Sequence, residues 1–166
     1  LRRQRQMCIR DSAHYDAKIP EGLTEFDKEA ALGVAENISA MIGALAGGAD
    51  VDCSPIIPGY QWISSGVGDF SFGSTLIEVK CIAKRFGASD YRQILMYWLL
   101  SYAAAVEGRG HEWKVGLLMN PRRNEIVALE FDSLLSTIAA GRTKVEILEL
   151  FSWLVGDYSR RVVDHA

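Results

Sequence analysis

Three ionisable side chains interrupt an otherwise apolar stretch of the sequence, residues 68–81, which reads GDFSFGSTLIEVKC. They are Asp69, Glu78 and Lys80. Burying a lysine and two acids among apolar residues is unfavourable unless the charges are paired or bind a ligand. The stretch therefore predicts either a buried salt bridge or a site that does chemistry.

The same stretch predicts a β-hairpin, with SFGS (residues 71–74) as its loop. In that register Asp69 pairs with Leu76. Side chains of a strand alternate between the two faces of a sheet, so Glu78 and Lys80 share one face and Asp69 lies diagonally across from Glu78 on it. Diagonal neighbours are about 7–8 Å apart at the backbone, which lets two carboxylates converge on one cation.

The cation that suits two carboxylates is Mg²⁺ or Mn²⁺. Such ions take one or two carboxylates, keep several waters and accept phosphate oxygens as further ligands. Their bound water becomes acidic, and they stabilise the added negative charge of a pentavalent phosphorane. Lys80 would orient or deprotonate that water, or neutralise charge on the scissile phosphate, and the residues alone leave these roles open. The alternative is a structural Glu–Lys or Asp–Lys pair on a solvated sheet face.

A second polar pair lies in the stretch DYRQILMYWLL, residues 90–100. Gln93 and Tyr97 are four residues apart, so in a helix they lie on the same face. Polar groups in so apolar a helix need hydrogen-bond partners for their polar ends. The alternative places both polar ends in solvent.

The elements around the hairpin follow from hydrophobic periodicity and turn residues. The first is a helix over residues 27–45, which Gly47 and Gly48 end. Thr143 and Glu146 have the capping-box spacing that opens the last helix. The others are a strand over 60–64, hairpin strands over 66–70 and 75–81, a helix from Ser89 or Asp90 to Val106, strands over 113–119 and 125–131, and a short helix through Leu134 and Leu135. The order α-β-β-β-α-β-β-α-α predicts an α/β (α+β) fold, a mixed β-sheet flanked by helices.

With these residues and this order of elements, the chain resembles the PD-(D/E)xK nuclease superfamily. The resemblance rests on D-(x)8-E-V-K in a hairpin followed by Q-x-x-x-Y on a helix, and it is closest to the RecB-like and phage-exonuclease-like branch. It covers residues 54–131, and with the N-terminal helix most of the chain. It implies a restriction-endonuclease-like fold and a Mg²⁺-dependent nuclease, with DNA as the foremost substrate.

The resemblance also implies roles for particular residues. Asp69 and Glu78 are then metal ligands, helped by the Val79 carbonyl, and Lys80 is the catalytic lysine. By the same resemblance, Gln93 and Tyr97 support the site or bind the nucleic-acid backbone.

The chain departs from the family pattern at a few points. Gly68 stands where the family often has proline before the aspartate. A further ligand on the first helix is assigned to Glu36, with Glu29 as the rival, and neither lies on the apolar face of that helix. The four cysteines of the iron–sulfur members are missing.

Composition sets the wider expectations. The 166 residues are 49% hydrophobic and 23% charged, typical of a globular chain. Residues 1–12 resemble an adapter-derived leader, which leaves one predicted domain over 13–166. The net charge of −3 argues against coating nucleic acid by bulk charge, so contacts with a polyanion must be local. The longest apolar run is shorter than the roughly 20 residues that a bilayer needs, so we expect a cytoplasmic protein without a membrane partner.

Other residue types carry expectations of their own. The three cysteines, Cys8, Cys53 and Cys81, are predicted to be reduced and buried. No C-x-x-C occurs, and His14, His111 and His165 lie at no metal-ligand spacing, which excludes zinc and iron–sulfur sites. Lys84, Arg85 and Arg92 lie near the hairpin in sequence and would contact phosphates, whereas Arg122 and Arg123 suit an ordinary solvated turn. The tryptophans Trp62, Trp98, Trp113 and Trp153 are predicted to pack in the core.

Two other functions remain open on the sequence alone. One is a non-catalytic nucleic-acid-binding or assembly module that keeps the fold. A protein partner or a homodimer is open for this module and for the nuclease alike. The other is an unrelated α/β interaction protein in which the motif is accidental, and it would be established by finding Asp69 and Glu78 far apart.

Overall fold

The computed structural model describes residue 22 and residues 24–163, with side chains described up to residue 156. The leader predicted over residues 1–12, together with Cys8, His14 and His165, lies outside the described residues. Contacts divide the chain into two units, Leu1–Gly33 and Val34–Ala166. The single domain expected over 13–166 stays a prediction.

Helix α2 (Glu25–Ala46) begins in the first unit and continues into the second. Its start is capped reciprocally: Asp27 N–H donates to Thr24 Oγ1 at 3.1 Å, and Thr24 N–H donates to Asp27 Oδ2 at 3.2 Å. Its end is set by Gly47 and Gly48, whose φ values of 56° and 91° suit glycine. The predicted first helix is therefore confirmed.

The second unit is built on a mixed β-sheet with the strand order β1-β4-β5-β6-β7. Strands β5 and β6 pair in parallel and the other neighbours pair antiparallel, so the predicted mixed α/β class is confirmed. A separate two-stranded sheet joins β2 and β3. The strands are β1 (Asp52–Cys53), β2 (Ile56–Ile57), β3 (Gly66–Val67), β4 (Phe70–Phe72), β5 (Thr75–Val79), β6 (Val115–Asn120) and β7 (Glu125–Glu130).

The strand predicted over residues 60–64 is wrong. This segment is a tight turn with one isolated bridge between Tyr60 and Ile63. Long-range contacts with the last helix hold it: Tyr60 OH lies 2.6 Å from Ser152 Oγ, and Trp62 Nε1 donates to Val155 O at 2.9 Å. Such contacts override the strand preference of aromatic residues. The short strands on either side of the turn, β2 and β3, pair with each other in the separate two-stranded sheet.

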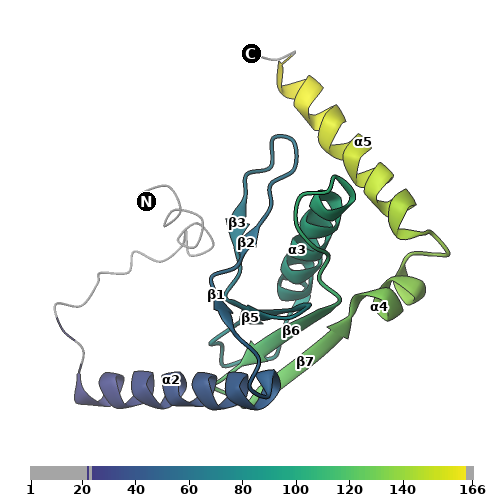
Figure 1. Ribbon diagram of the computed structural model, residues 1–166. Helices are drawn as coiled ribbons and strands as arrows, with labels where there is room; N and C mark the ends of the chain where they lie inside the picture. The colour runs from purple at the N-terminus through teal and green to yellow at the C-terminus, as the bar shows by residue number, and fades with distance from the viewer. Residues whose placement is uncertain (1–21, 23, 164–166) are drawn as a thin grey trace. The chain divides into compact units, whose positions relative to one another are not determined.

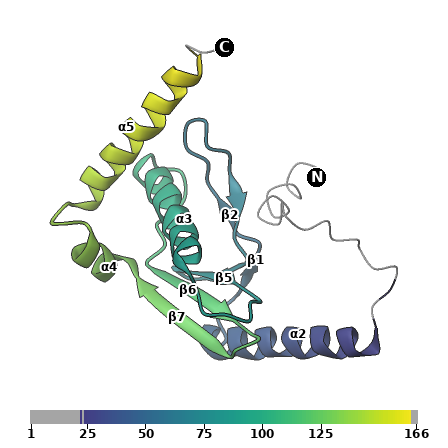
Figure 2. The ribbon, with the colours of Figure 1, turned by 180° about the vertical axis from the view of Figure 1, so that it is seen from behind.

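Helix α3 (Ala88–Val106) packs on one face of the sheet, as Figures 1 and 2 show. The buried side chains between helix and sheet include Leu76, Ile94, Trp98 and Leu118. The approach is close, because a Cβ added at Gly116 of β6 would lie 2.8 Å from Ile94 Cδ1. A side chain at position 116 would therefore push α3 away from the sheet.

The opposite face of the sheet packs against residues of α2. Met41 and Ile42 of the helix form a buried cluster with Ile77, Leu117 and Met119 of the strands. Since side chains alternate along β5, Ile77 faces α2 while Leu76 and Glu78 face α3. This alternation decides where the ionisable residues of the hairpin point.

The prediction that the tryptophans are buried is half right, and the prediction that the cysteines are buried is wrong for the two that the structure describes. Trp98 and Trp113 are buried, but Trp62 and Trp153 are 52% and 66% exposed, because they lie on a turn and on the outer side of the last helix. Cys53 and Cys81 are free and exposed, so the prediction of buried thiols is wrong for both. The reason is position: Cys53 lies on the edge strand β1, and Cys81 follows the end of β5.

The last two helices are α4 (Phe131–Ile138) and α5 (Lys144–Val163). The predicted capping box of α5 is confirmed, since Thr143 Oγ1 donates to Glu146 Oε2 at 2.8 Å and Glu146 N–H donates to Thr143 Oγ1 at 3.3 Å. Lys144 Nζ pairs with Glu112 at 2.7 Å and with Asp132 at 2.5 Å, which ties the start of α5 to the rest of the unit. Among the described residues, no helix has the length and apolar character to cross a membrane.

The ion pairs of Glu112 with Lys114 and Lys144 predict how the stability of the protein depends on pH. Burial alone would raise the pKa of Glu112, but hydrogen bonds from Lys114, Lys144 and Trp98 hold it below its usual value. A carboxyl whose pKa is lower in the folded protein contributes stability above its unfolded pKa and loses it as pH falls through the folded value. We therefore expect Glu112→Gln to cost about 1–2 kcal/mol at pH 7 and progressively less as the pH is lowered through the folded pKa of Glu112.

Thermal unfolding of wild type and Glu112→Gln across this pH range measures the effect. Asp132→Asn is the matched control and should change stability less, because the Asp132 side chain is 51% exposed. A Glu112→Gln deficit that stays the same from pH 7 down to the lowest pH at which both proteins are folded would contradict the ion-pair explanation.

Candidate active site

The hairpin that carries Asp69 and Glu78 has a different register from the predicted one. Phe70 pairs with Ile77 and Phe72 with Thr75, so the loop is Gly73–Ser74 rather than the four residues 71–74. The predicted pairing of Asp69 with Leu76 is therefore wrong. The shift is two residues, and an even shift leaves every side chain on its predicted face.

Asp69 lies one position before β4, where continuation of the ladder would place it opposite Glu78. Its backbone is held by Ser54, whose N–H donates to Asp69 O at 2.9 Å. Its carboxylate turns toward β5, and Val79 N–H donates to Asp69 Oδ2 at 2.7 Å. In a strand the N–H and C=O of one residue point to the same side, so the Val79 carbonyl is directed to the side on which Asp69 lies.

Glu78 is the most buried acid of the site, with 5% of its surface exposed. Its Oε1 accepts hydrogen bonds from Lys80 Nζ at 2.8 Å and from Gln93 Nε2 at 2.7 Å. Gln93 Oε1 in turn accepts from Lys80 Nζ at 2.7 Å, which closes a ring of three side chains. Strand β5 and helix α3 thus meet through this ring.

Tyr97 extends the ring along α3, because Gln93 Nε2 also donates to Tyr97 OH at 2.9 Å. Gln93 and Tyr97 therefore lie on one face of the helix, as their spacing predicts, and the alternative of both polar ends in solvent is wrong. The structure brings together six of the residues singled out in the sequence: Asp69, Glu78, Val79, Lys80, Gln93 and Tyr97.

The electrostatics of the site show an excess of negative charge. Burial, and then the charge of Asp69, raise the pKa of Glu78, and the bonds from Lys80 and Gln93 only partly oppose this. Burial lowers the pKa of Lys80, but its hydrogen bond to Glu78 and the charges of Glu78, Asp90 and Asp69 raise it above the usual value. The two partners differ because the lysine is attracted by several acids, while Glu78 is more deeply buried and repelled by Asp69. One lysine does not compensate both carboxylates.

The donor set suits a hard divalent cation. Asp69 Oδ1 and Glu78 Oε2 accept no hydrogen bond from the residues that the structure describes, and the Val79 carbonyl is directed to the same side as Asp69. No cluster of three or more His, Cys, Asp or Glu side chains suited to a metal occurs in the described part of the chain. Mg²⁺ requires no such cluster, because it is commonly held by one or two carboxylates with waters and substrate oxygens.

The first candidate for a ligand on the first helix, Glu36, is not brought to the site. Glu36 is exposed on α2, whose buried residues pack on the face of the sheet opposite Glu78. Glu29 is also exposed and belongs to the other unit. Within the second unit, the carboxylates hydrogen-bonded in the site are those of Asp69 and Glu78, and the charge of Asp90 also acts on Lys80.

One residue of the site region was missed from the sequence. Asn120, at the end of β6, is fully buried, and its Nδ2 donates to Ile82 O at 2.8 Å. Its Oδ1 accepts from Arg122 N–H at 3.2 Å, so it joins the segment after Lys80 to the turn between β6 and β7. An asparagine directly before a proline turn at a strand end was the available signal.

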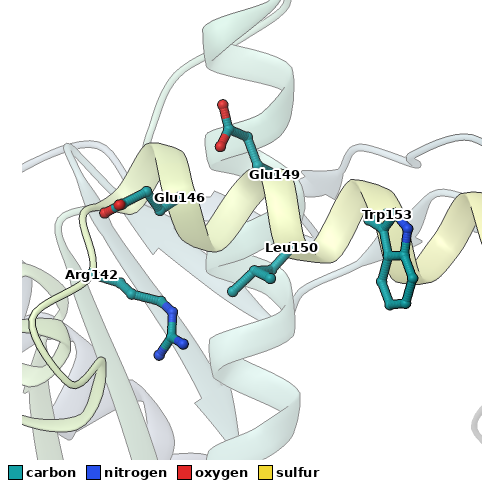
Figure 3. Close-up of a pocket in the computed structure, with 5 residues that line it drawn as sticks. All are labelled: Arg142, Glu146, Glu149, Leu150 and Trp153. Atoms are coloured by element: carbon teal, nitrogen blue, oxygen red, sulfur yellow. The ribbon is translucent and has the colours of Figure 1, made fainter.

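A separate hollow lies along α5, and Figure 3 shows the residues that line it. Leu150 and Trp153 project from the same side of the helix, whereas Glu149 points away. None of the residues around Glu78 lines this hollow. It is therefore a feature distinct from the candidate active site.

Comparison of the chain with models of protein families, with curated proteins and with solved structures gave no match. The candidate site is therefore argued from its own geometry. The similarity to the PD-(D/E)xK nuclease superfamily stays a resemblance based on the sequence motif.

Proposed function

We propose that this protein is a metal-dependent nuclease that hydrolyses phosphodiester bonds in DNA, with Mg²⁺ or Mn²⁺ as cofactor. The observation that carries the proposal is the meeting of Asp69, Glu78 and Lys80 at one end of β5, with one oxygen of each carboxylate not hydrogen-bonded by described residues. Two acids and a lysine with this arrangement suit a cation, a water and a phosphate better than they suit a closed salt bridge.

In this proposal the residues have separate roles. Asp69, Glu78 and the Val79 carbonyl would hold the cation, which when bound supplies an acidic water and positive charge next to the phosphate. Lys80 is held by Glu78 and Gln93, and so keeps its ammonium beside these carboxylates. There it can orient the attacking water or neutralise charge that develops on the phosphate. Gln93 positions the lysine and Glu78 together, and Tyr97 supports Gln93.

One observation favours a second candidate, a non-catalytic nucleic-acid-binding or assembly module with the same fold. Lys80, Gln93 and one oxygen of Glu78 satisfy each other without a cation. Such a ring would also stabilise a protein that cleaves nothing. A large separation of Asp69 and Glu78 would have established the accidental-motif alternative, but the Asp69 carboxylate accepts a hydrogen bond from Val79 N–H, next to Glu78.

Time courses with linear and circular DNA test the proposal. Wild type is incubated with Mg²⁺, with Mn²⁺ and with EDTA, and the products are separated by size. The proposal requires cleavage with either metal and none with EDTA. Binding of DNA without cleavage under any condition would favour the binding module instead.

A milder effect is expected at Gln93. Replacing it with alanine removes the bonds that position Glu78 and Lys80 but leaves both charged groups in place, so cleavage should slow by about tenfold. Tyr97→Phe is the matched control and should stay near wild type, because it removes only the hydroxyl that Gln93 contacts. Initial cleavage rates measure both variants, and a Gln93→Ala rate equal to wild type would show that the ring does not position the site.

A further inference from the structure

The lysines and arginines without an ion pair are concentrated in one region. Ion pairs engage Lys28, Lys80, Arg109, Lys114, Arg123 and Lys144. Among the side chains that the structure describes, the cations without an ion pair are Lys84, Arg85, Arg92, Arg122 and Arg142. All of them except Arg142 belong to the segment after β5, the first turns of α3, or the turn after β6. They are all exposed, so their charges are available to a ligand.

Two of these segments are fastened to each other. Asn120 Nδ2 donates to Ile82 O at 2.8 Å, and Arg123 Nη1 donates to Ala83 O at 3.1 Å. Arg123 is itself held by Glu125, with its Nε 2.9 Å from the carboxylate. The turn after β6 and the segment that carries Lys84 are therefore joined at two points.

The same region adjoins the candidate active site. Strands β5 and β6 are parallel, so both end at the same end of the sheet, and Lys80 N–H donates to Met119 O at 2.8 Å there. Arg92 is the neighbour of Gln93 on α3. The carboxyl ends of parallel strands are where open α/β sheets bind their ligands.

We propose that Lys84, Arg85, Arg92 and Arg122 form a phosphate-binding rim that holds the nucleic-acid backbone beside the candidate active site. The proposal rests on the proposed function for the identity of the polyanion. Exposed lysines and arginines contact phosphates and carry no sequence information, so the rim binds nucleic acid without reading bases. It also explains how a chain of net charge −3 binds a polyanion, since the contact is local. Asn120 is the positioning residue that holds the two parts of the rim together.

The rim is tested by binding of a fluorescein-labelled DNA duplex in EDTA, where cleavage is prevented, at a series of salt concentrations. The rim variant carries Gln at all four positions, and the control variant carries Gln at four cations outside the rim, Lys28, Arg109, Lys114 and Arg142. Both variants lose the same formal charge. Thermal unfolding first establishes that each variant is folded, which is expected because the replaced side chains are exposed or half-exposed.

The rim variant should bind about 10- to 100-fold more weakly than wild type, and the slope of log K against log salt should shrink by about 3–4. The control variant should keep the wild-type slope. A rim variant with wild-type affinity and slope, or a control variant that loses as much, overturns the rim whether or not wild type cleaves DNA. If wild type binds through the rim but cleaves nothing with Mg²⁺ or Mn²⁺, the rim stands and the proposed function fails.

Discussion

Replacing Lys80 with alanine is expected to slow DNA cleavage by about 10²–10³, because an electrostatic contact of this kind acts mainly where charge develops in the transition state. DNA binding should stay near its wild-type value, since Lys80 is not part of the rim, and Mn²⁺ affinity should change less than in Glu78→Gln, because Lys80 contacts the ligand Glu78 without being a ligand itself. Single-turnover cleavage, calorimetry with Mn²⁺ and duplex binding in EDTA separate the three effects.

Lys80→Arg distinguishes the roles that remain open for the lysine. Arginine keeps the positive charge but does not give up its proton, so it can neutralise a phosphate and cannot act as a base. Substantial activity in Lys80→Arg would assign the residue to charge neutralisation. A Lys80→Ala variant that cleaves as fast as wild type would show that the catalytic residues are elsewhere, even if the fold is right.

Glu78→Gln is expected to abolish both the response to metal and cleavage. The amide keeps the size of the side chain and an oxygen that can accept from Lys80, but it cannot supply a charged ligand. We expect Mn²⁺ affinity to fall by more than about 100-fold, since outer-shell changes alone typically cost 10–100-fold. Cleavage should then be undetectable, because no water is activated without the cation.

The matched control for Glu78→Gln is Glu112→Gln, which neutralises another partly buried glutamate held by lysines. It should bind Mn²⁺ and cleave DNA as wild type does at pH 7, despite its lower stability. Asp69→Asn should behave like Glu78→Gln, because Asp69 supplies the other carboxylate. Unchanged Mn²⁺ affinity in Glu78→Gln would move the metal ligands elsewhere.

The arrangement of the site was predictable from sequence because it depends only on which face of the sheet each side chain occupies, and side chains alternate between the two faces along a strand. Glu78 and Lys80 are two residues apart, so they share a face in any register of the hairpin. The predicted loop was two residues too long, and this moved Asp69 along the strand without moving it to the other face. A one-residue error would have separated Asp69 from Glu78.

Features that depend on long-range contacts were not predictable in the same way. Residues 60–64 read as a strand, but their aromatic side chains are bonded to α5, which lies about ninety residues later in the chain. Cys81 reads as a buried strand residue, but β5 ends at Val79 and Cys81 is exposed in the segment that follows. The role of Asn120 was not predictable either, because it depends on the hydrogen bond that Asn120 donates to Ile82 O in a distant segment.

The central claim is that Asp69 and Glu78 hold one divalent cation, and crystals soaked in Mn²⁺ test it most directly. Anomalous scattering would place the ion without reference to any activity assay. We expect one strong peak within bonding distance of the Asp69 and Glu78 carboxylates and the Val79 carbonyl, and no such peak in crystals of Glu78→Gln. A peak at other residues, or no peak with Glu78 still bonded to Lys80 and Gln93, would contradict the claim.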